Sequence, residues 1–250
     1  MELVTADGVR LAATRWRAEP PGRGTVVLVH GFAAGGTETR VVALAEALRG
    51  HGFDVLAYDA RGHGASDGAT TLGHDERLDV AAAVAAVAPS GTPLVVVGAS
   101  MGAIAALRFA AARPEALAGV VTVSCPARWR LPRNARGVLS ALLTQTPVGR
   151  NVARRHLGVR ITARVARAEP PVELAARLAV PLAVLHGRRD PFIAPEDAAL
   201  LYDAAHDPRR LDLVAGLGHA FEASAIAPVR AAVDWCVDHA DSPSEPAGAV

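Results

Sequence analysis

The sequence predicts an α/β fold in which a mostly parallel β-sheet is covered by helices on both faces. Along most of the 250 residues, short apolar runs rich in valine alternate with longer alanine-rich stretches. Continuous apolar runs of this length are typical of strands that are buried on both faces of a parallel sheet. Their alternation with helical stretches is the pattern of helices that connect parallel strands. A chain of this length can bury one large core.

Each element of this fold has its own stretch of sequence. The runs expected to form buried strands are Thr25–Val29, Asp54–Tyr58, Leu94–Val97, Gly119–Val123, Leu182–Leu185 and Arg210–Val214. The stretches expected to form helices are Thr39–Arg49, Asp75–Ala88, Ala103–Ala112, Glu196–Ala205 and Pro228–His239. A turn at Asp7 and Gly8 between two short extended runs predicts an antiparallel hairpin at the edge of the sheet.

One stretch, residues 126–170, interrupts the alternation. It contains no clear strand, several prolines and glycines, and two helical pieces around Gly137–Leu143 and Asn151–Ala168. An insertion of this kind between two strands predicts a small helical cap, and we call these residues the cap segment. The rest divides into an α/β core (residues 1–125 and 171–240) and a tail (residues 241–250), whose Ser, Pro, Glu and Gly content predicts disorder.

The strand Leu94–Val97 leads directly into Gly98-Ala99-Ser100-Met101-Gly102, and a helical stretch follows. In this context the pattern G-x-S-x-G is typical of a nucleophilic serine on a sharp turn. The flanking glycines are needed because larger side chains would collide at such a turn. The turn also brings the Ser100 hydroxyl near the free N–H groups of a helix N-terminus, which stabilise negative charge. An inert serine in a tight connection is the alternative interpretation.

A serine hydroxyl is a weak nucleophile at neutral pH, so it needs a base and a group that orients the base. Asp190 follows the strand Leu182–Leu185, and His219 follows the strand Arg210–Val214 behind a Gly-Leu-Gly loop. Because open α/β sheets build their sites at the carboxyl ends of their strands, we expect both residues beside the serine. The strand Gly119–Val123 is followed by no carboxylate, which leaves Asp190 with little competition.

Acyl transfer also needs two N–H donors directed at the oxyanion of the tetrahedral intermediate. One is expected to be the backbone N–H of Met101, directly after the candidate nucleophile. The other is expected from the loop after Thr25–Val29, where we choose the N–H of Phe32. Gly31 suits a loop whose backbone must approach the substrate closely. His30 is expected to shape this loop.

Together these segments resemble the α/β-hydrolase superfamily. The resemblance rests on His30-Gly31-Phe32, Tyr58–Gly68, Gly98–Gly102, Asp190 and Gly218-His219, and it covers nearly the whole chain except the cap segment and the tail. It implies an eight-stranded, mostly parallel sheet, a cap after the sixth strand, and no cofactor. Dehalogenases and epoxide hydrolases of this fold use an aspartate where this chain has a serine, which argues against those activities. Peptidases, C–C bond hydrolases and cofactor-free haloperoxidases also belong to the superfamily.

Aromatic residues gather near the predicted chemistry. Phe32, Phe192 and Phe221 are three of the five phenylalanines, and they directly follow Gly31, Pro191 and Ala220 in the three site loops. In a chain with 4% aromatic residues, this clustering predicts an apolar pocket for an acyl or alcohol group. The residues expected to bind substrate are Gly31, Trp129, Phe192 and Phe221. The alternative is that the rings anchor loops onto the core.

The cap segment is strongly basic. Glu169 is its one acidic residue, and its ten arginines are Arg128, Arg130, Arg133, Arg136, Arg150, Arg154, Arg155, Arg160, Arg164 and Arg167. Such a surface can recruit an anionic substrate, such as a phosphopantetheine thioester, an acidic carrier protein, a phospholipid or a carboxylated ester. The alternative is a solvated face whose arginines pair with acids of the core. No nucleic-acid-binding motif accompanies the basic residues, so we expect no nucleic acid as a partner.

Several classes of protein are excluded by composition. No apolar run approaches the ~18 residues that a membrane-spanning helix needs, and no secretory signal is visible, so we expect a cytoplasmic protein. Cys125 and Cys236 lie far apart and have no metal-ligand spacing, so we expect reduced, buried thiols and no metal site. All 26 basic residues are arginine, which excludes Schiff-base chemistry on a lysine.

The function expected from these observations is a serine hydrolase that cleaves a small-molecule carboxylic ester through an acyl-serine intermediate. One alternative keeps the same machinery but acts as a thioesterase on an acyl thioester of CoA or of a carrier protein. Another is a catalytically silent binding protein that retains the hydrolase fold.

Overall fold

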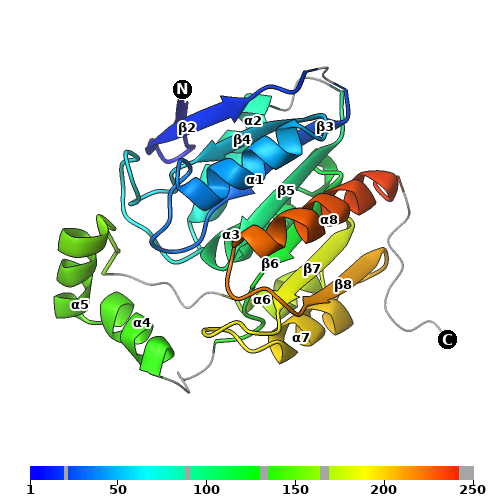
Figure 1. Cartoon of the computed structure of the whole chain (residues 1–250). Coiled ribbons are helices and arrows are strands. Elements are labelled where there is room, and N and C mark those ends of the chain that lie inside the picture. The colour runs from blue at the N-terminus through cyan, green and yellow to red at the C-terminus, as the bar shows by residue number, and fades with distance from the viewer. Residues whose placement is uncertain (20–21, 88–90, 130–134, 164–168, 242–250) are drawn as a thin grey trace.

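The computed structural model describes residues 1–19, 22–87, 91–129, 135–163 and 169–241. These residues form an eight-stranded sheet in the order β1-β2-β4-β3-β5-β6-β7-β8 (Figure 1). The strands are β1 (Glu2–Val4), β2 (Arg10–Trp16), β3 (Gly24–Val29), β4 (Phe53–Tyr58), β5 (Leu94–Ala99), β6 (Gly119–Val123), β7 (Leu182–Gly187) and β8 (Arg209–Val214). The predicted number of strands is confirmed, and so is the predicted α/β-hydrolase arrangement.

Strand direction follows the prediction as well. Strands β3 to β8 pair in parallel, whereas β1 and β2 form the expected antiparallel hairpin and β2 pairs antiparallel with β4. At the carboxyl ends, Val29 pairs with Gly98, Ala99 with Val123, and Val123 with Leu185. The ends of β3, β5, β6 and β7 therefore lie side by side, and the loops that follow them share one edge of the sheet.

Helices cover both faces of the sheet (Figure 1). One face packs against α1 (Thr39–Arg49) and α8 (Ile226–Asp238), and the other against α2 (Glu76–Val87), α3 (Met101–Ala112), α6 (Pro171–Ala175) and α7 (Glu196–Ala204). In β3, Val26 and Leu28 belong to the first core, and Val27 and Val29 to the second. Both faces of the strand are buried, which is why its sequence is continuously apolar. Two short 3₁₀ turns, η2 (Pro114–Ala116) and η4 (Ala223–Ala225), complete the core.

The predicted helices are present in the core, with ends that differ by at most two residues, although Ala88 lies outside the described residues. In the cap segment the structure has α4 (Ala135–Gln145), α5 (Pro147–Val152) and the π-helical turn η3 (Ala153–Leu157). The prediction of a helix over Asn151–Ala168 is wrong for residues 158–163. Gly158 adopts a left-handed conformation with φ 67°, which ends the helix. Residues 164–168 lie outside the described part, as do residues 242–250 of the predicted tail.

The cap segment follows β6, and α4 and α5 stand beside the main body of the molecule in Figure 1. The chain that leaves η3 is fastened to the loop after β4. The N–H of Arg160 donates to the carbonyl of Gly62 at 2.8 Å, and its carbonyl accepts from the N–H of Thr70 at 2.7 Å. The Arg160 guanidinium also donates to the carbonyls of Gly68 and Ser66. One arginine thus ties the cap segment to the core through both its main chain and its side chain.

Both cysteines are free thiols buried in the core, as predicted. Across the described ranges, none of the helices combines the length and the apolar character needed to cross a membrane.

Candidate active site

Ser100 occupies the turn between β5 and α3 with φ 51° and ψ −112°. Residues other than glycine rarely adopt a positive φ, so this backbone is strained, as the motif predicts. A Cβ atom on Gly98 would lie 2.4 Å from the carbonyl oxygen of Gly102, and one on Gly102 would lie 2.3 Å from that of Val29. Because both distances are well inside van der Waals contact, the turn tolerates only glycine at these two positions.

A short hydrogen bond joins Asp190 and His219. The Nδ1–H of His219 donates to Oδ2 of Asp190 at 2.7 Å, and the aspartate side chain is fully buried. Burial raises the pKa of Asp190, but hydrogen bonds from His219 and from the amides of Ile193 and Phe192 outweigh it, and the pKa is lowered overall. The charged carboxylate holds the proton on Nδ1 and leaves Nε2 of His219 available as a base.

The three residues of the predicted triad follow β5, β7 and β8, on the same edge of the sheet. The hydroxyl of Ser100 makes no hydrogen bond to His219 or to any other described residue. Contacts between a nucleophile and its base are often loose without substrate and tighten when the substrate binds. No group of three His, Cys, Asp or Glu residues within the described ranges could hold a metal ion.

Two residues that the sequence analysis missed support the loop of His219. The carboxylate of Glu222 accepts from the N–H groups of Gly218 at 3.0 Å and His219 at 3.2 Å. Ala220, with φ 59°, donates its N–H to the hydroxyl of Ser124 at 3.2 Å. A glutamate three residues after a histidine in a glycine loop is a local signal that could have identified Glu222. Ser124 lies 96 residues from its partner, so no local pattern points to it.

The two candidate oxyanion donors are both available. In the part of the chain that the structure describes, the backbone N–H groups of Phe32 and Met101 donate no hydrogen bond to the protein. Met101 is the first residue of α3, and such N–H groups have no partner within the helix. A Cβ atom on Gly31 would lie 3.5 Å from Cβ of Ser100, so the loop after β3 runs directly beside the candidate nucleophile.

Buried histidines hold this loop in place. Nδ1–H of His30 donates to the carbonyl of Gly31 at 2.7 Å, and its Nε2 accepts from the N–H of Ala60 at 2.9 Å. Burial and the neighbouring His63 lower the pKa of His30 to about 4, so its ring is neutral at pH 7. Nε2 of His63 accepts from the N–H of Ala33 at 3.4 Å. This is the shaping role expected for His30.

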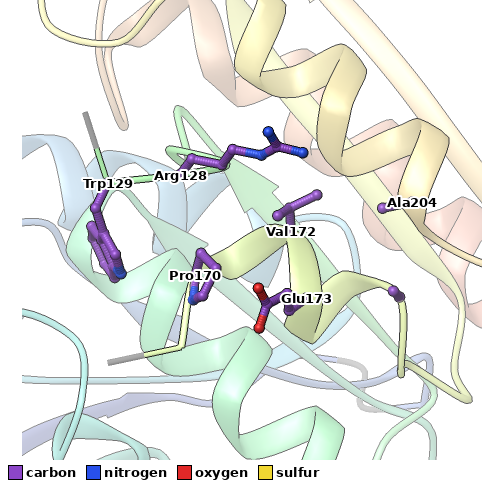
Figure 2. A pocket seen from close by; sticks show the side chains of 7 residues that line it. Arg128, Trp129, Pro170, Val172, Glu173 and Ala204 are labelled. Atoms are coloured by element: carbon purple, nitrogen blue, oxygen red, sulfur yellow. The ribbon is translucent and has the colours of Figure 1, made fainter. Parts of the chain in front are cut away.

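The residues expected to bind substrate lie in different surroundings. The ring of Phe192 is 49% exposed and lies 4.9 Å from the ring of His219, centroid to centroid. Phe221 is only 4% exposed and belongs to the core under α1 and α8, which favours its alternative role as a loop anchor. Trp129 lines a pocket of about 530 Å³ together with α6 residues such as Glu173 (Figure 2). None of the candidate catalytic residues lines that pocket.

The arginines of the cap segment have no acidic partners among the described residues. Arg150 donates to the carbonyl of Gln145, and Arg154 donates to the side chain of Asn151. The guanidinium carbon of Arg136 lies 6.0 Å from the ring centroid of Phe192. The interpretation in which these arginines pair with core acids finds no support in the described part. Arg130, Arg133, Arg164 and Arg167 lie outside it.

Comparison with known proteins identifies similar hydrolases. The profile of the serine aminopeptidase (S33) family matches residues 20–169. Human monoglyceride lipase is 34% identical over 127 residues, which are 49% of this chain and 41% of the human protein, so the match spans about two fifths of that relative. An esterase of Pyrococcus furiosus is 22% identical with a TM-score of 0.73, covering 96% of this chain and 90% of that one. A monoacylglycerol lipase of Paleococcus ferrophilus is 24% identical with a TM-score of 0.67, covering 92% and 99%. At these identities the two structures establish a shared fold.

Proposed function

Because the chain belongs to the serine aminopeptidase (S33) family and is an esterase/lipase-like serine hydrolase, we propose that it cleaves small-molecule carboxylic esters with Ser100, His219 and Asp190 as its catalytic triad. The observation that carries the proposal is the 2.7 Å hydrogen bond from Nδ1 of His219 to the buried carboxylate of Asp190. It supports an imidazole held with a proton on Nδ1 and with Nε2 directed to accept one, at the same sheet edge as the strained Ser100 turn.

In the first half of the reaction, Oγ of Ser100 forms a bond to the acyl carbon while its proton passes to Nε2 of His219. The carbonyl oxygen becomes an oxyanion and accepts hydrogen bonds from the N–H groups of Phe32 and Met101. When the tetrahedral intermediate collapses, the bond between the acyl carbon and the alcohol oxygen breaks. His219 returns its proton to that oxygen, the alcohol leaves, and an acyl-serine remains.

In the second half, a water molecule attacks the acyl carbon and gives its proton to His219. The second tetrahedral intermediate collapses with cleavage of the bond to Oγ, and Ser100 recovers the proton from His219. The products are the carboxylic acid and the free enzyme. Asp190 stays ionised throughout and stabilises the imidazolium form of His219.

Monoacylglycerols are the first substrates to test, since two similar proteins bear the names monoglyceride lipase and monoacylglycerol lipase. The half-exposed ring of Phe192 beside His219 offers apolar surface to such a substrate. Thioesters of CoA or of a carrier protein are the second candidate, favoured by the described arginines of the cap segment, which form no ion pair with the described acids. The same steps apply, with sulfur in the place of the alcohol oxygen.

A fluorophosphonate probe tests the proposal, because it labels only a serine that is activated as a nucleophile. We expect the wild-type chain and Ser224→Ala to be labelled, since Ser224 is an exposed serine of η4. The Ser100→Ala variant is expected to lose both labelling and ester hydrolysis. Labelling that survives in Ser100→Ala would exclude Ser100 as the nucleophile. A folded wild-type chain that is never labelled would favour the silent binding protein.

A further inference from the structure

The ring of Phe192 contacts both the candidate base and the cap segment. Phe192 contacts the ring of His219 at 4.9 Å between centroids, and the guanidinium carbon of Arg136 lies 6.0 Å from the centroid of the same phenylalanine. This second distance is within the range of a cation–π contact. Arg136 belongs to the first turn of α4 and is exposed. The two contacts together place its guanidinium carbon within about 11 Å of the His219 ring.

The positive charge of Arg136 has no acidic partner in the part of the chain that the structure describes. Within the described ranges no acid forms an ion pair with it, and residues 135–157 contain neither Asp nor Glu. The carboxylates on the His219 side of the site have other partners, since Asp190 accepts from His219 and Glu222 accepts from backbone amides. Arg188 and Arg189, which precede Asp190, are also exposed. Near Asp190 and His219 the chain therefore carries exposed arginines that form no ion pair with the described acids.

The location of Arg136 near His219 indicates which half of the substrate it would contact. In the proposed reaction His219 gives its proton to the leaving group, so the leaving group passes along the edge of the imidazole ring. Phe192 lies against that ring, and Arg136 lies against Phe192. Because both side chains lie near the group that would protonate the leaving group, we assign a group bound by Arg136 to the leaving alcohol or thiol and not to the acyl chain.

We propose that Arg136 binds a phosphate on the leaving group, so that the enzyme prefers esters whose alcohol is phosphorylated, such as an acylated glycerol phosphate. This inference rests on the proposed function and narrows its substrate class. A planar guanidinium forms paired, charge-assisted hydrogen bonds with phosphate. The limit of about 11 Å favours a leaving group as short as phosphoglycerol, because the extended phosphopantetheine arm of CoA is longer than this limit.

The test compares two substrates with the same hexanoyl chain, monohexanoylglycerol and monohexanoylglycerol phosphate. The measured quantity is the ratio of kcat/KM for the phosphorylated ester to that for the neutral ester. We expect Arg136→Gln to lower this ratio about tenfold and Arg155→Gln to leave it unchanged. Arg155 is an exposed arginine of η3, so its substitution removes the same charge from the same segment. Raising the salt concentration should also lower the wild-type ratio.

An equal fall of the ratio in both variants would overturn the assignment to Arg136 and indicate a diffuse basic surface. An unchanged ratio in Arg136→Gln would overturn it as well. If hexanoyl-CoA, compared with the neutral hexanoyl thioester of N-acetylcysteamine, is the only pair that responds to Arg136→Gln, the short phosphorylated alcohol is the wrong leaving group.

A binding measurement separates this inference from the catalytic proposal. Calorimetry with glycerol 3-phosphate requires no turnover, and we expect binding to the wild-type chain that is about tenfold weaker in Arg136→Gln. If no ester is hydrolysed and no probe reacts, the proposed function fails. The titration still shows whether Arg136 binds a phosphate. Equal binding to the two chains would overturn the site even in an active esterase.

Discussion

The loops that carry Asp190 and His219 differ from the cap segment in how their charged groups are satisfied. Asp190 accepts three hydrogen bonds, and Glu222 accepts two from the loop of the candidate base. In the cap segment, four described arginines contact carbonyls, an amide or an aromatic ring, and none of the described arginines forms an ion pair with an acid of the described part. Paired charges fix a geometry, whereas unpaired exposed charges remain available to a ligand. The hydrogen-bonded carboxylates thus lie in the loops of the candidate triad, whereas the described arginines of the cap segment carry charge without an acidic partner in the described part.

The largest effect is expected from a substitution that removes the hydrogen bond between Asp190 and His219. Asp190→Asn should lower kcat/KM about 10³- to 10⁴-fold, because an amide no longer holds the tautomer of His219 that exposes Nε2 as a base. Ester hydrolysis measured on the folded variant checks this expectation. Asp212→Asn, which removes the ion-pair partner of Arg210 on β8, is the matched control and should stay near wild-type activity. Comparable losses in the two variants would contradict the role of Asp190.

A second test uses pH. The folded chain takes up a proton on His30 only near pH 4, whereas the unfolded chain does so below its ordinary pKa of 6.5. The free energy of unfolding should therefore fall by about 3 kcal/mol as the pH drops from 6.5 to 4, and this contribution is fully present above pH 6.5.

Urea unfolding of the wild-type chain and of His30→Gln over this pH range measures the effect. Glutamine can still accept from the N–H of Ala60 but does not titrate, so its pH dependence should be flatter. His156→Gln, an exposed change in the cap segment, should follow the wild-type curve. Parallel curves for all three chains would exclude His30 as the source.

The third prediction concerns the close packing around Gly102, in the turn that follows β5. Gly102→Ala should lower the free energy of unfolding by about 2 kcal/mol, because the added methyl group would lie 2.3 Å from a backbone oxygen of β3. Gly216→Ala is the control, since a Cβ atom there meets nothing within 4 Å. The denaturant concentration at the midpoint of unfolding, measured for both variants, tests this prediction. Equal midpoints would mean that the turn adjusts to a methyl group.

The smallest expected effect is on stability, and it compares two arginines of the cap segment, one bonded to the core and one not. Arg160→Gln should cost about 1 kcal/mol, because its guanidinium donates to two loop carbonyls of the core. Arg154→Gln should stay within about 0.5 kcal/mol, as expected for an exposed side chain without an ion pair to the described residues. Thermal unfolding of both variants provides the measurement. Equal losses would show that the tie to the core adds nothing specific.

Local patterns were enough to predict most of the framework. The strands β3 and β5 are continuous apolar runs, and the motif around Ser100 combines a strand end, two glycines and a helix start in one short stretch. Asp190 and His219 were predicted because chain order and sheet topology place strand ends at a common edge. In each case the deciding forces act between residues that are near in sequence or belong to a regular element.

Contacts between distant segments account for what the sequence did not reveal. The helix predicted over Asn151–Ala168 ends early because Gly158 turns left-handed and the next residues pair with the loop after β4. Phe221 follows the candidate base, yet its ring packs into the core. The contact of Arg136 with Phe192 joins segments that are 56 positions apart, and no local periodicity encodes it.

The main-chain fastening of the cap segment has an evolutionary consequence. Its bonds to Gly62 and Thr70 use backbone atoms of Arg160, so they persist whatever side chains the neighbouring helices carry. Gly62 bears the constraint, since a Cβ atom there would lie 2.4 Å from the Arg160 carbonyl oxygen. The attachment therefore does not depend on which side chains residues 135–157 carry. Such an architecture lets a lineage exchange the ligands it attracts without redesigning the machinery that would act on them.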